Sequence, residues 1–345
     1  MTERAKPPTL ADVARLADVS VPAASRALNG GVRGMKSGSP EMRARVEQAA
    51  LTLGYSVNPA AQTIKGGRAR TAAFIVADID DFGSATMIAG VMHAAEDHGM
   101  SVAVRTTKDD PQRELQILAQ LRGERHRAII MATSRTTDPA REAAVGEQLQ
   151  ILADHGAHIV IIGDNELGFP TVTVDNHRAA RLLAEGLARA GRRRFAVISG
   201  PAVEITARDR VQGFVEGLAE YDIHVDERDI IHTEFSRNGG YQAVSEIADR
   251  LGEFDVITAM SDAMAVGAIA RLRELDLTVP RDMEVTGFDH VPMLGDVLQS
   301  FSTVEVPLER FGAEALALAL AEEPTKVLIS LEATPIVHGE PARLL

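Results

Sequence analysis

The chain has 345 residues, of which 45% are apolar, with no cysteine and a net charge of −13. Its length fits two or three domains with sizeable cores, and the lack of cysteine excludes disulfides, thiolate nucleophiles and zinc–thiolate sites. No apolar run reaches the about 18 residues of a membrane helix, and none follows the first basic residues as in a signal peptide. We therefore expect a cytoplasmic protein with no membrane partner.

The charge is divided unevenly along the chain. Residues 1–70 hold eleven Lys and Arg against five Asp and Glu, a net charge of +6, and the remainder carries −19. A basic head on an acidic body is expected when only the head meets phosphate groups. A merely solvated basic segment would explain the charge equally well, but it would not explain the helical pattern inside that segment.

Residues 9–30 predict a helix-turn-helix. Thr9 can cap a first helix with one apolar stripe, and Ser20 can cap a second helix that carries Val21 and Pro22 in its first turn. The outer face of the second helix holds Ser25, Arg26 and Asn29. A short turn followed by a helix with an outward arginine is typical of the motif whose second helix enters the major groove of DNA.

A third helix is expected from Ser39-Pro40 to about Leu53, so that residues 1–57 form a small headpiece. Residues 58–68 can then form a short helix that begins at Asn58, contains Ile64 and Lys65, and stops at two glycines. Such a helix would be marginal alone. The residues leave two alternatives of equal weight, a linker helix that orders on a partner and an ordinary flexible linker.

From residue 69 onward, short apolar strands alternate with amphipathic helices. The expected strands are 72–77, 101–105, 128–132, 158–163 and 171–174, and then 195–200, 229–233, 255–260 and 283–289. Continuous apolar strands between helices predict parallel sheets covered on both faces. The two series therefore predict an α/β core of two doubly wound parallel-sheet subdomains, behind an all-α headpiece.

No catalytic constellation is present. The chain lacks a nucleophile elbow, an HExxH motif, a P-loop and a glycine-rich dinucleotide motif after a strand. His155 and His158 fit a solvent-facing pair better than a metal site, and Arg192-Arg193-Arg194 fits a solvated turn. We therefore expect no catalytic residue, no metal and no cofactor.

Polar side chains follow several of the expected strands. A helix cap is the more frequent role for any one of them, but strand ends that converge on the cleft between two subdomains favour a site for a polar small molecule. These residues are Asp78, Asp80, Asp81, Asp164, Ser261, Asp262 and Asp289, with Arg210 in a nearby helix. Carboxylates beside an arginine suit hydroxyls or mixed charge and would repel a polyanion.

Together these blocks resemble the lactose-repressor/galactose-repressor (LacI/GalR) family of transcription regulators over nearly the whole chain. The resemblance is carried by TLADVARLADVSVPAASRALNG (9–30), SPEMRARVEQAALTLGYSVNPAAQTIKGG (39–67), VDN (174–176), GRRRFAVISGP (191–201), RDRVQGF (208–214), SDAMAVGAI (261–269) and VTGFD (285–289). It implies a homodimer that reads a pseudo-palindromic double-stranded operator. It also implies a core like the type I periplasmic sugar-binding proteins.

The resemblance places the base-reading positions on Val21, Pro22 and Arg26. Arg26 can pair with guanine, whereas Val21 and Pro22 can contact thymine methyl groups or only fit the groove. It also favours a hinge helix that orders on DNA, with Ile64 as a wedge in the minor groove. The DNA-contacting set is then Thr9, Ser20, Val21, Pro22, Ser25, Arg26, Asn29, Asn58, Ile64 and Lys65.

In the core, Arg210 and Asp289 match the family's recurring effector contacts. The expected effector-binding set is Asp81, Ser84, Asp164, Arg210, Ser261 and Asp289. Gly83 and Ser84 stand where many members have two Phe, and aromatic residues make up only 4% of the chain, so stacking on a sugar ring is less available. In the headpiece, Asp18 replaces the usual glycine of the turn.

We interpret the chain as a repressor whose operator affinity is controlled by a small polar effector, a sugar or sugar derivative, bound between the core subdomains. The sequence leaves open whether effector releases or promotes DNA binding. The expected domains are a headpiece (1–57), a hinge (58–68), an N-subdomain (69–175 and 306–324) and a C-subdomain (176–305 and 325–345). The alternatives are an α/β enzyme acting on a small polar substrate and a ligand-binding protein without a DNA function. The chain ends without a heptad-bearing tail, which favours a dimer over a tetramer.

Overall fold

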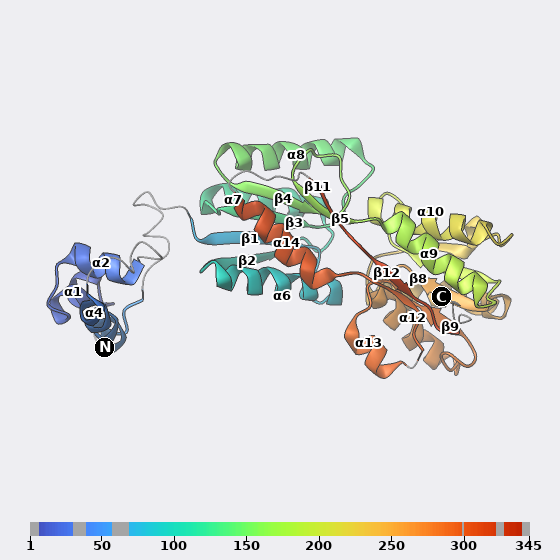
Figure 1. Ribbon diagram of the computed structural model, residues 1–345. Coiled ribbons are helices and arrows are strands. Elements are labelled where there is room, and N and C mark those ends of the chain that lie inside the picture. The colour runs from blue at the N-terminus through green and yellow to red at the C-terminus, as the bar shows by residue number, and fades with distance from the viewer. Residues whose placement is uncertain (1–6, 30–38, 57–68, 299, 322–327, 340–345) are drawn as a thin grey trace, which may run out of the picture. The chain divides into compact units, whose positions relative to one another are not determined.

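The computed structural model describes residues 7–29, 39–56, 69–298, 300–321 and 328–339. The chain divides into two compact units, 1–69 and 70–345, drawn as ribbons in Figure 1. The first unit is an all-α headpiece and the second is an α/β core.

Within its described residues the headpiece contains α1 (Leu10–Leu16), α2 (Val21–Asn29) and α4 (Pro40–Leu53). The apolar stripes of the three helices meet in a core that includes Val13, Ala14, Ala17, Ala24, Val46, Ala49 and Ala50. The expected start signals are confirmed, because Thr9 and Asp12 form a capping box and Ser39 caps α4 with Pro40 in its first turn. Gly54 ends α4 in the left-handed conformation, at φ 63°.

The turn between α1 and α2 contains a second left-handed residue, Asp18, at φ 52°. The amide of Val19 donates to the carbonyl of Ala14 at 3.0 Å and so closes the end of α1. A residue with a side chain costs free energy in this conformation, although Asp tolerates it better than most. The left-handed Asp18 therefore leaves the turn strained.

The larger sheet of the core is parallel, with the strand order β11-β5-β4-β3-β1-β2. We call this sheet and its helices the N-lobe. Its elements are β1 (Thr71–Val76), α6 (Phe82–Asp97), β2 (Ser101–Thr106), α7 (Pro111–Glu124), β3 (Ala128–Ala132), α8 (Pro139–Asp154), β4 (His158–Ile162), β5 (Thr171–Val174), α14 (Leu308–Leu320) and β11 (Leu328–Leu331).

Strand β1 shows how both faces of this sheet are covered. Ala72, Phe74 and Val76 belong to the same apolar cluster as residues of α6 and α14. Ala73 and Ile75 point the other way, into a cluster with α7 and α8. All five side chains are fully buried, as expected for a strand of a parallel sheet between two helical layers.

The second parallel sheet has the strand order β7-β6-β8-β9. We call it and its helices the C-lobe. Its elements are α9 (Asn176–Arg189), β6 (Phe195–Ser199), α10 (Ile205–Ala219), η1 (Glu227–Asp229), β7 (Ile230–His232), α11 (Arg237–Glu246), η2 (Ala248–Glu253), β8 (Val256–Ala259), α12 (Asp262–Glu274), β9 (Glu284–Thr286) and α13 (Pro292–Val297). The expected pair of doubly wound parallel sheets is thus confirmed.

A small antiparallel sheet, β10 (Thr303–Glu305) with β12 (Thr334–Ile336), adjoins the C-lobe. Within the described residues the chain passes between the lobes from β5 to α9, from β10 to α14 and from β11 to β12 (Figure 1). The expected assignment of 325–345 to the C-subdomain is wrong for β11, which pairs with β5 from Leu328–Thr171 to Leu331–Val174. This edge strand extends the N-lobe sheet, so the chain returns to the C-lobe only after Leu331.

The strain at Asp18 can be tested with two substitutions. Asp18→Gly should stabilise the headpiece by about 0.5–1 kcal/mol, because glycine adopts the left-handed conformation without steric cost. Asp18→Ala should have no such effect or should destabilise it. Hydrogen exchange of the peptide 9–29 in the full chain measures the difference. Equal protection in the two variants would show that the turn carries no strain.

Candidate functional site

The exposed face of α2 begins with apolar residues. The hydroxyl of Ser20 accepts a hydrogen bond from the amide of Ala23 at 3.4 Å, which sets the start of the helix. Val21 is 43% exposed, and Pro22 and Arg26 are exposed as well. Ala24, on the opposite face, is fully buried against α1 and α4. Helix α2 therefore presents one apolar turn and a guanidinium to the outside.

Of the other residues expected to contact DNA, the structure describes the side chains of Thr9 and Ser25 but not those near the hinge. The Thr9 hydroxyl is engaged with Asp12, at 2.6 Å between oxygens, and Ser25 is half-buried. Asn29 is the last residue of α2. The side chain of Asn29 lies outside the described residues, as do Asn58, Ile64 and Lys65 of the expected hinge.

Arg210, in α10, is the centre of the polar site in the core. Its guanidinium donates to Asn176 Oδ1 at 2.8 Å, to the carbonyl of Met260 at 2.6 Å, and to Asp289 Oδ1 at 3.3 Å. It also lies over the ring of Phe288, 3.8 Å from the centroid. A buried guanidinium needs such partners, because leaving its donors unpaired would cost several kcal/mol (about 3–5). Arg210 thus connects the start of α9 with the carboxyl ends of β8 and β9.

Asp289 lies three residues after β9, in a backbone conformation that is unusual for a residue with a side chain. Its φ is 119°, and the following His290 has φ 55°. Strained backbone of this kind persists where the surroundings fix it, and it concentrates at functional sites. Burial raises the pKa of Asp289 to about 8 despite the opposing effect of Arg210, and the carboxylates of Asp262 and Asp81 raise it further. Among the described residues the side-chain hydrogen bond to this carboxyl comes from Arg210.

Asp81 and Ser84 approach Asp289 from the N-lobe. Asp81 caps α6, because its Oδ2 accepts the amide of Ser84 at 2.8 Å. A side chain at Gly83 would lie 4.0 Å from Asp289 Oδ2. The first turn of α6 and the end of β9 therefore face each other across the lobes. Of the expected effector-binding set, the structure brings Asp81, Ser84, Arg210 and Asp289 together.

Asp164 and Ser261 are engaged locally. The Asp164 carboxylate accepts from the Thr173 hydroxyl at 2.7 Å, and burial followed by the nearby Asp209 and Asp175 raises its pKa, against the effect of Thr173. The Ser261 hydroxyl caps α12 by accepting the amide of Met264 at 3.2 Å. Capping, the alternative role for residues at strand ends, thus applies to Ser261.

Two residues that the sequence did not assign to the site, Asn176 and Phe288, hold Arg210. Asp262, a strand-end candidate outside the expected effector-binding set, is fully buried near Asp289. Asp262 accepts the amide of Val291 at 2.6 Å and the hydroxyl of Thr303 at 3.0 Å, which fixes the loop after Asp289. Burial raises the pKa of Asp262 to about 6, although these hydrogen bonds lower it. The VDN and VTGFD blocks contain Asn176 and Phe288 and were the available signal.

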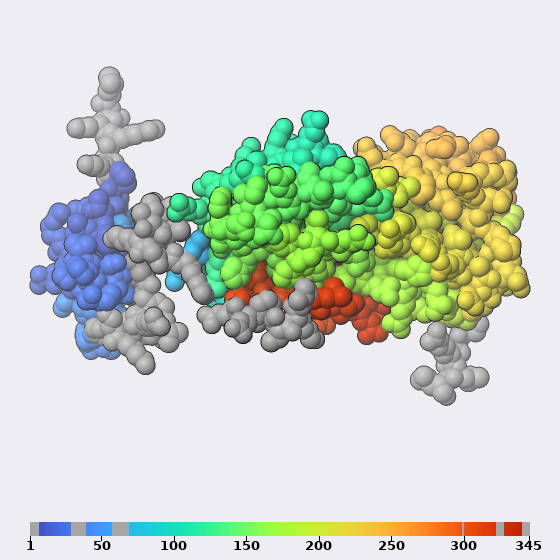
Figure 2. Space-filling model, turned by 90° about the horizontal axis from the view of Figure 1, so that it is seen from above, coloured from blue at the N-terminus to red at the C-terminus, as the bar shows by residue number. Residues whose placement is uncertain are grey.

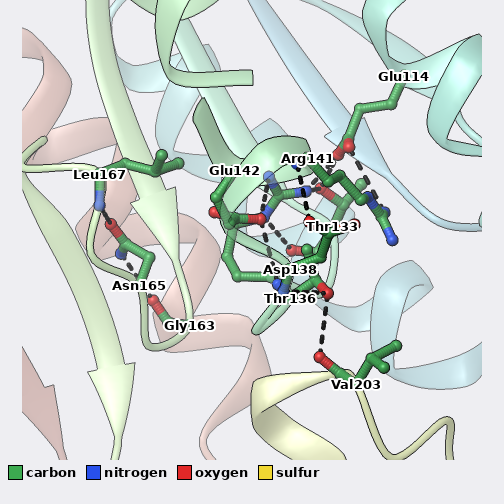
Figure 3. A network of polar contacts seen from close by, with 11 residues as sticks. Glu114, Thr133, Thr136, Asp138, Arg141, Glu142, Gly163, Asn165, Leu167 and Val203 are labelled. Atoms are coloured by element: carbon green, nitrogen blue, oxygen red, sulfur yellow. Dashed lines mark hydrogen bonds and ion pairs between the residues drawn. The ribbon is translucent and has the colours of Figure 1, made fainter. Parts of the chain in front are cut away.

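A second polar network lies at the carboxyl end of β3 (Figure 3). Arg135, which is 2% exposed, pairs with Glu114 and Glu142, and Thr133 donates to Glu114 at 2.7 Å. The network holds the loop after β3 against the C-lobe, where the hydroxyl of Thr136 donates to the carbonyl of Val203 at 3.0 Å. In Figure 2 the green segments of the N-lobe and the yellow segments of the C-lobe meet along a seam.

Metal-binding groups and membrane helices are both absent from the part of the chain that the structure describes. These residues contain no group of three or more His, Cys, Asp or Glu side chains that could hold a metal ion. Nor does any described helix combine the length and the apolar character needed to cross a membrane.

Comparison with known proteins gives the chain its family. The model described as periplasmic binding proteins and sugar binding domain of LacI family matches residues 69–330, and the model of bacterial regulatory proteins of the lacI family matches residues 9–58. The transcriptional regulator CelR of Thermobifida fusca is 28% identical over 92% of each chain. The transcriptional repressor CytR of Escherichia coli K12 is 29% identical over 90% of this chain and 89% of its own.

Solved structures agree with these matches. The CelR–cellobiose complex has a TM-score of 0.67 and 26% identity, and it covers 97% of this chain and 100% of its own. The lac repressor bound to ONPG in its repressed state has a TM-score of 0.79 over 97% of this chain and 100% of its own, at 21% identity, which shows a shared fold. These relatives are regulators, which removes the enzyme and the free ligand-binding protein as alternatives. The chain belongs to the LacI family of DNA-binding transcriptional regulators.

Proposed function

We propose that α2 is the recognition helix, with Arg26 reading guanine and with Val21 and Pro22 in contact with thymine methyl groups or the groove wall. The observation that carries this proposal is the exposed apolar first turn of α2, followed one turn later by an exposed Arg26. The lac repressor is described as a dimer bound to operator. A homodimer of this chain would place two such helices on a pseudo-palindromic operator, with residues 58–68 as the hinge.

The cleft between the lobes binds the effector in this proposal. Arg210 and Asp289 supply a donor and a strong acceptor at the carboxyl ends of parallel strands, where ligands of such folds bind. Asp81 and Ser84 face them from α6, with Asp164 and Ser261 on the walls. CelR is described in complex with cellobiose and the lac repressor with ONPG, which supports a sugar or sugar derivative. A regulator that binds chromosomal DNA in a bacterium would act in the cytoplasm.

Regulation follows from population shift. An effector that contacts both lobes favours one arrangement of them and so changes operator affinity by its differential affinity for the two arrangements. The same architecture allows two modes of regulation: the effector can release the repressor from the operator, or it can promote operator binding.

The role of Arg26 is tested by Arg26→Ala on an operator selected from random DNA. The variant should lose about 1–3 kcal/mol of affinity for that operator and its preference for the guanine, because a bidentate contact disappears. Fluorescence anisotropy against selected and scrambled DNA measures both quantities. Arg45→Ala, which removes an exposed arginine from α4, is the matched control and should keep the preference. Equal selectivity in the two variants would disprove the assignment.

The cleft is tested by a thermal-shift screen of sugars, polyols and sugar acids. A true effector at 100 times its dissociation constant should add about 2.7 kcal/mol of stability. Asp289→Asn should weaken that effector by about 0.5–1.5 kcal/mol, because a carboxyl group that bonds the ligand is replaced by an amide with a different donor and acceptor pattern, and should leave operator affinity nearly unchanged. Asp296→Asn removes an exposed carboxylate from α13 and serves as the control. A normal response of the Asp289 variant would place the effector elsewhere.

A further inference from the structure

One part of the seam between the lobes is rich in carboxylates. Asp109 follows β2 of the N-lobe, whereas Glu204 and Glu234 follow β6 and β7 of the C-lobe. We call these three residues the seam carboxylates. The pKa of Asp109 is raised, first by the protein around it and then by the charge of Glu234, with smaller contributions from Asp78 and Asp81 and an opposing one from Arg141. Carboxyl groups from both lobes thus lie within range of one another.

Glu204 is held in this place by backbone contacts to the N-lobe. It forms an antiparallel bridge with Thr136, and the amide of Ile205 donates to the carbonyl of Arg135 at 2.9 Å. Glu204 also occupies the N-cap position of α10, where an acidic side chain usually bonds the helix amides, but it makes no such bond. Its side chain is therefore not explained by helix capping.

The Glu204 carboxyl is almost completely buried, at 8% exposure, and its Oε2 has no hydrogen-bond partner among the described residues. Burial raises the pKa of Glu204 to about 7, with a further increase from Asp109, while Ser134, Arg141 and Arg135 act in the opposite direction. Burying an unpaired carboxyl oxygen costs free energy. An unpaired buried carboxyl oxygen calls for an explanation, and a ligand that supplies the missing donor is one.

No described arginine forms an ion pair with Glu204. Arg135 pairs with Glu114 and Glu142, and Arg141 Nη2 lies 3.6 Å from Glu114, while the Nε of Arg141 is buried without a hydrogen-bond partner and does not reach Glu204. Negative charge at the seam therefore exceeds positive charge, and a bound cation would offset it. A metal ion does not fit, because no described group of three acidic or histidine side chains could hold one.

Asp81 connects the seam carboxylates with the proposed effector site. Its charge raises the pKa of Asp109 at one end and that of Asp289 at the other. Both regions lie at the junction of the lobes, where Glu204 bridges to Thr136 and where the first turn of α6 at Gly83 approaches Asp289.

We propose that the effector carries a protonated amine, which is received by Glu204 and Asp109 from opposite lobes, while its hydroxyls reach Arg210 and Asp289. This inference rests on the proposed effector function of the cleft and names the class of ligand, an amino sugar or amino polyol. The ammonium group donates to the unpaired Oε2 of Glu204. Because its two partners belong to different lobes, the amine also draws the lobes together.

The test compares ligands that differ only by the amine. The full chain is titrated calorimetrically at pH 7 with glucosamine and glucose, galactosamine and galactose, and glucamine and sorbitol. At least one amine should bind about tenfold or more tightly than its neutral partner, because a charge-assisted hydrogen bond is formed. Glu204→Gln should abolish the difference. Glu220→Gln, which removes an exposed carboxylate at the far end of α10, should keep it.

The pH profile supplies a second readout. Glucamine has an aliphatic amine that stays protonated to pH 8. Its affinity should rise as the pH increases from 6 through about 7, since binding requires the ionised Glu204 carboxylate, and the rise should be smaller in Glu204→Gln, where Asp109 and Asp289 are the remaining groups of the site with raised pKa values.

The inference is overturned if no amine binds more tightly than its neutral partner, or if Glu204→Gln retains the preference. The effector function of the cleft is judged separately. If neutral sugars bind the protein and Asp289→Asn weakens that binding, the effector function of the cleft stands and only the amine is rejected. If Asp289→Asn leaves ligand binding unchanged, the effector does not bind in the cleft.

Discussion

The candidate effector site depends on the burial of one guanidinium. Arg210 is satisfied only if the start of α9, the end of β8 and the end of β9 come together around it, since its partners are Asn176, Met260 and Asp289. Stacking on Phe288 covers one of its faces. The position of Asp289, and hence its unusual backbone and raised pKa, follows from this arrangement. Removal of any partner would leave a buried donor unpaired.

The opposite side of the site is fixed by close contact between helices. Gly90 of α6 lies so near the backbone of α14 that an added Cβ would sit 1.9 Å from the carbonyl oxygen of Glu309, and Gly312 meets Met87 in the same way. Helix α14 directly follows the passage of the chain from β10 into the N-lobe. Movement of that passage must therefore move α6 and the Asp81 cap with it. This contact couples the ligand-facing turn of α6 to the junction of the lobes.

Features that act locally were the ones that could be predicted from the sequence. Thr9 and Ser39 mark helix starts through their own side chains, and the apolar runs mark the buried strands. The place of β11 could not be predicted, because pairing with β5 is a contact between segments far apart in the chain. The role of Asn176 could not be predicted for the same reason, since its hydrogen bond with Arg210 joins residues 34 positions apart. Glu204 was missed because its strand end carries no polar residue until five positions after β6.

Asp289 and Glu204, at the two ends of the proposed cleft, are similar in their electrostatics. Asp289 and Glu204 both have raised pKa values, to about 8 and about 7, and in each case burial is the largest cause. The Glu204 residue is 8% exposed and the Asp289 side chain 13% exposed, so contact with water is limited at both, and among the described residues Glu204 forms no ion pair. Folding alone therefore leaves both carboxyls without sufficient donors, a local conflict of the kind that proteins retain at functional sites. A ligand rich in hydrogen-bond donors would supply both carboxyls. One molecule can reach both of them only when the lobes are close together. Its binding energy therefore favours that arrangement of the lobes.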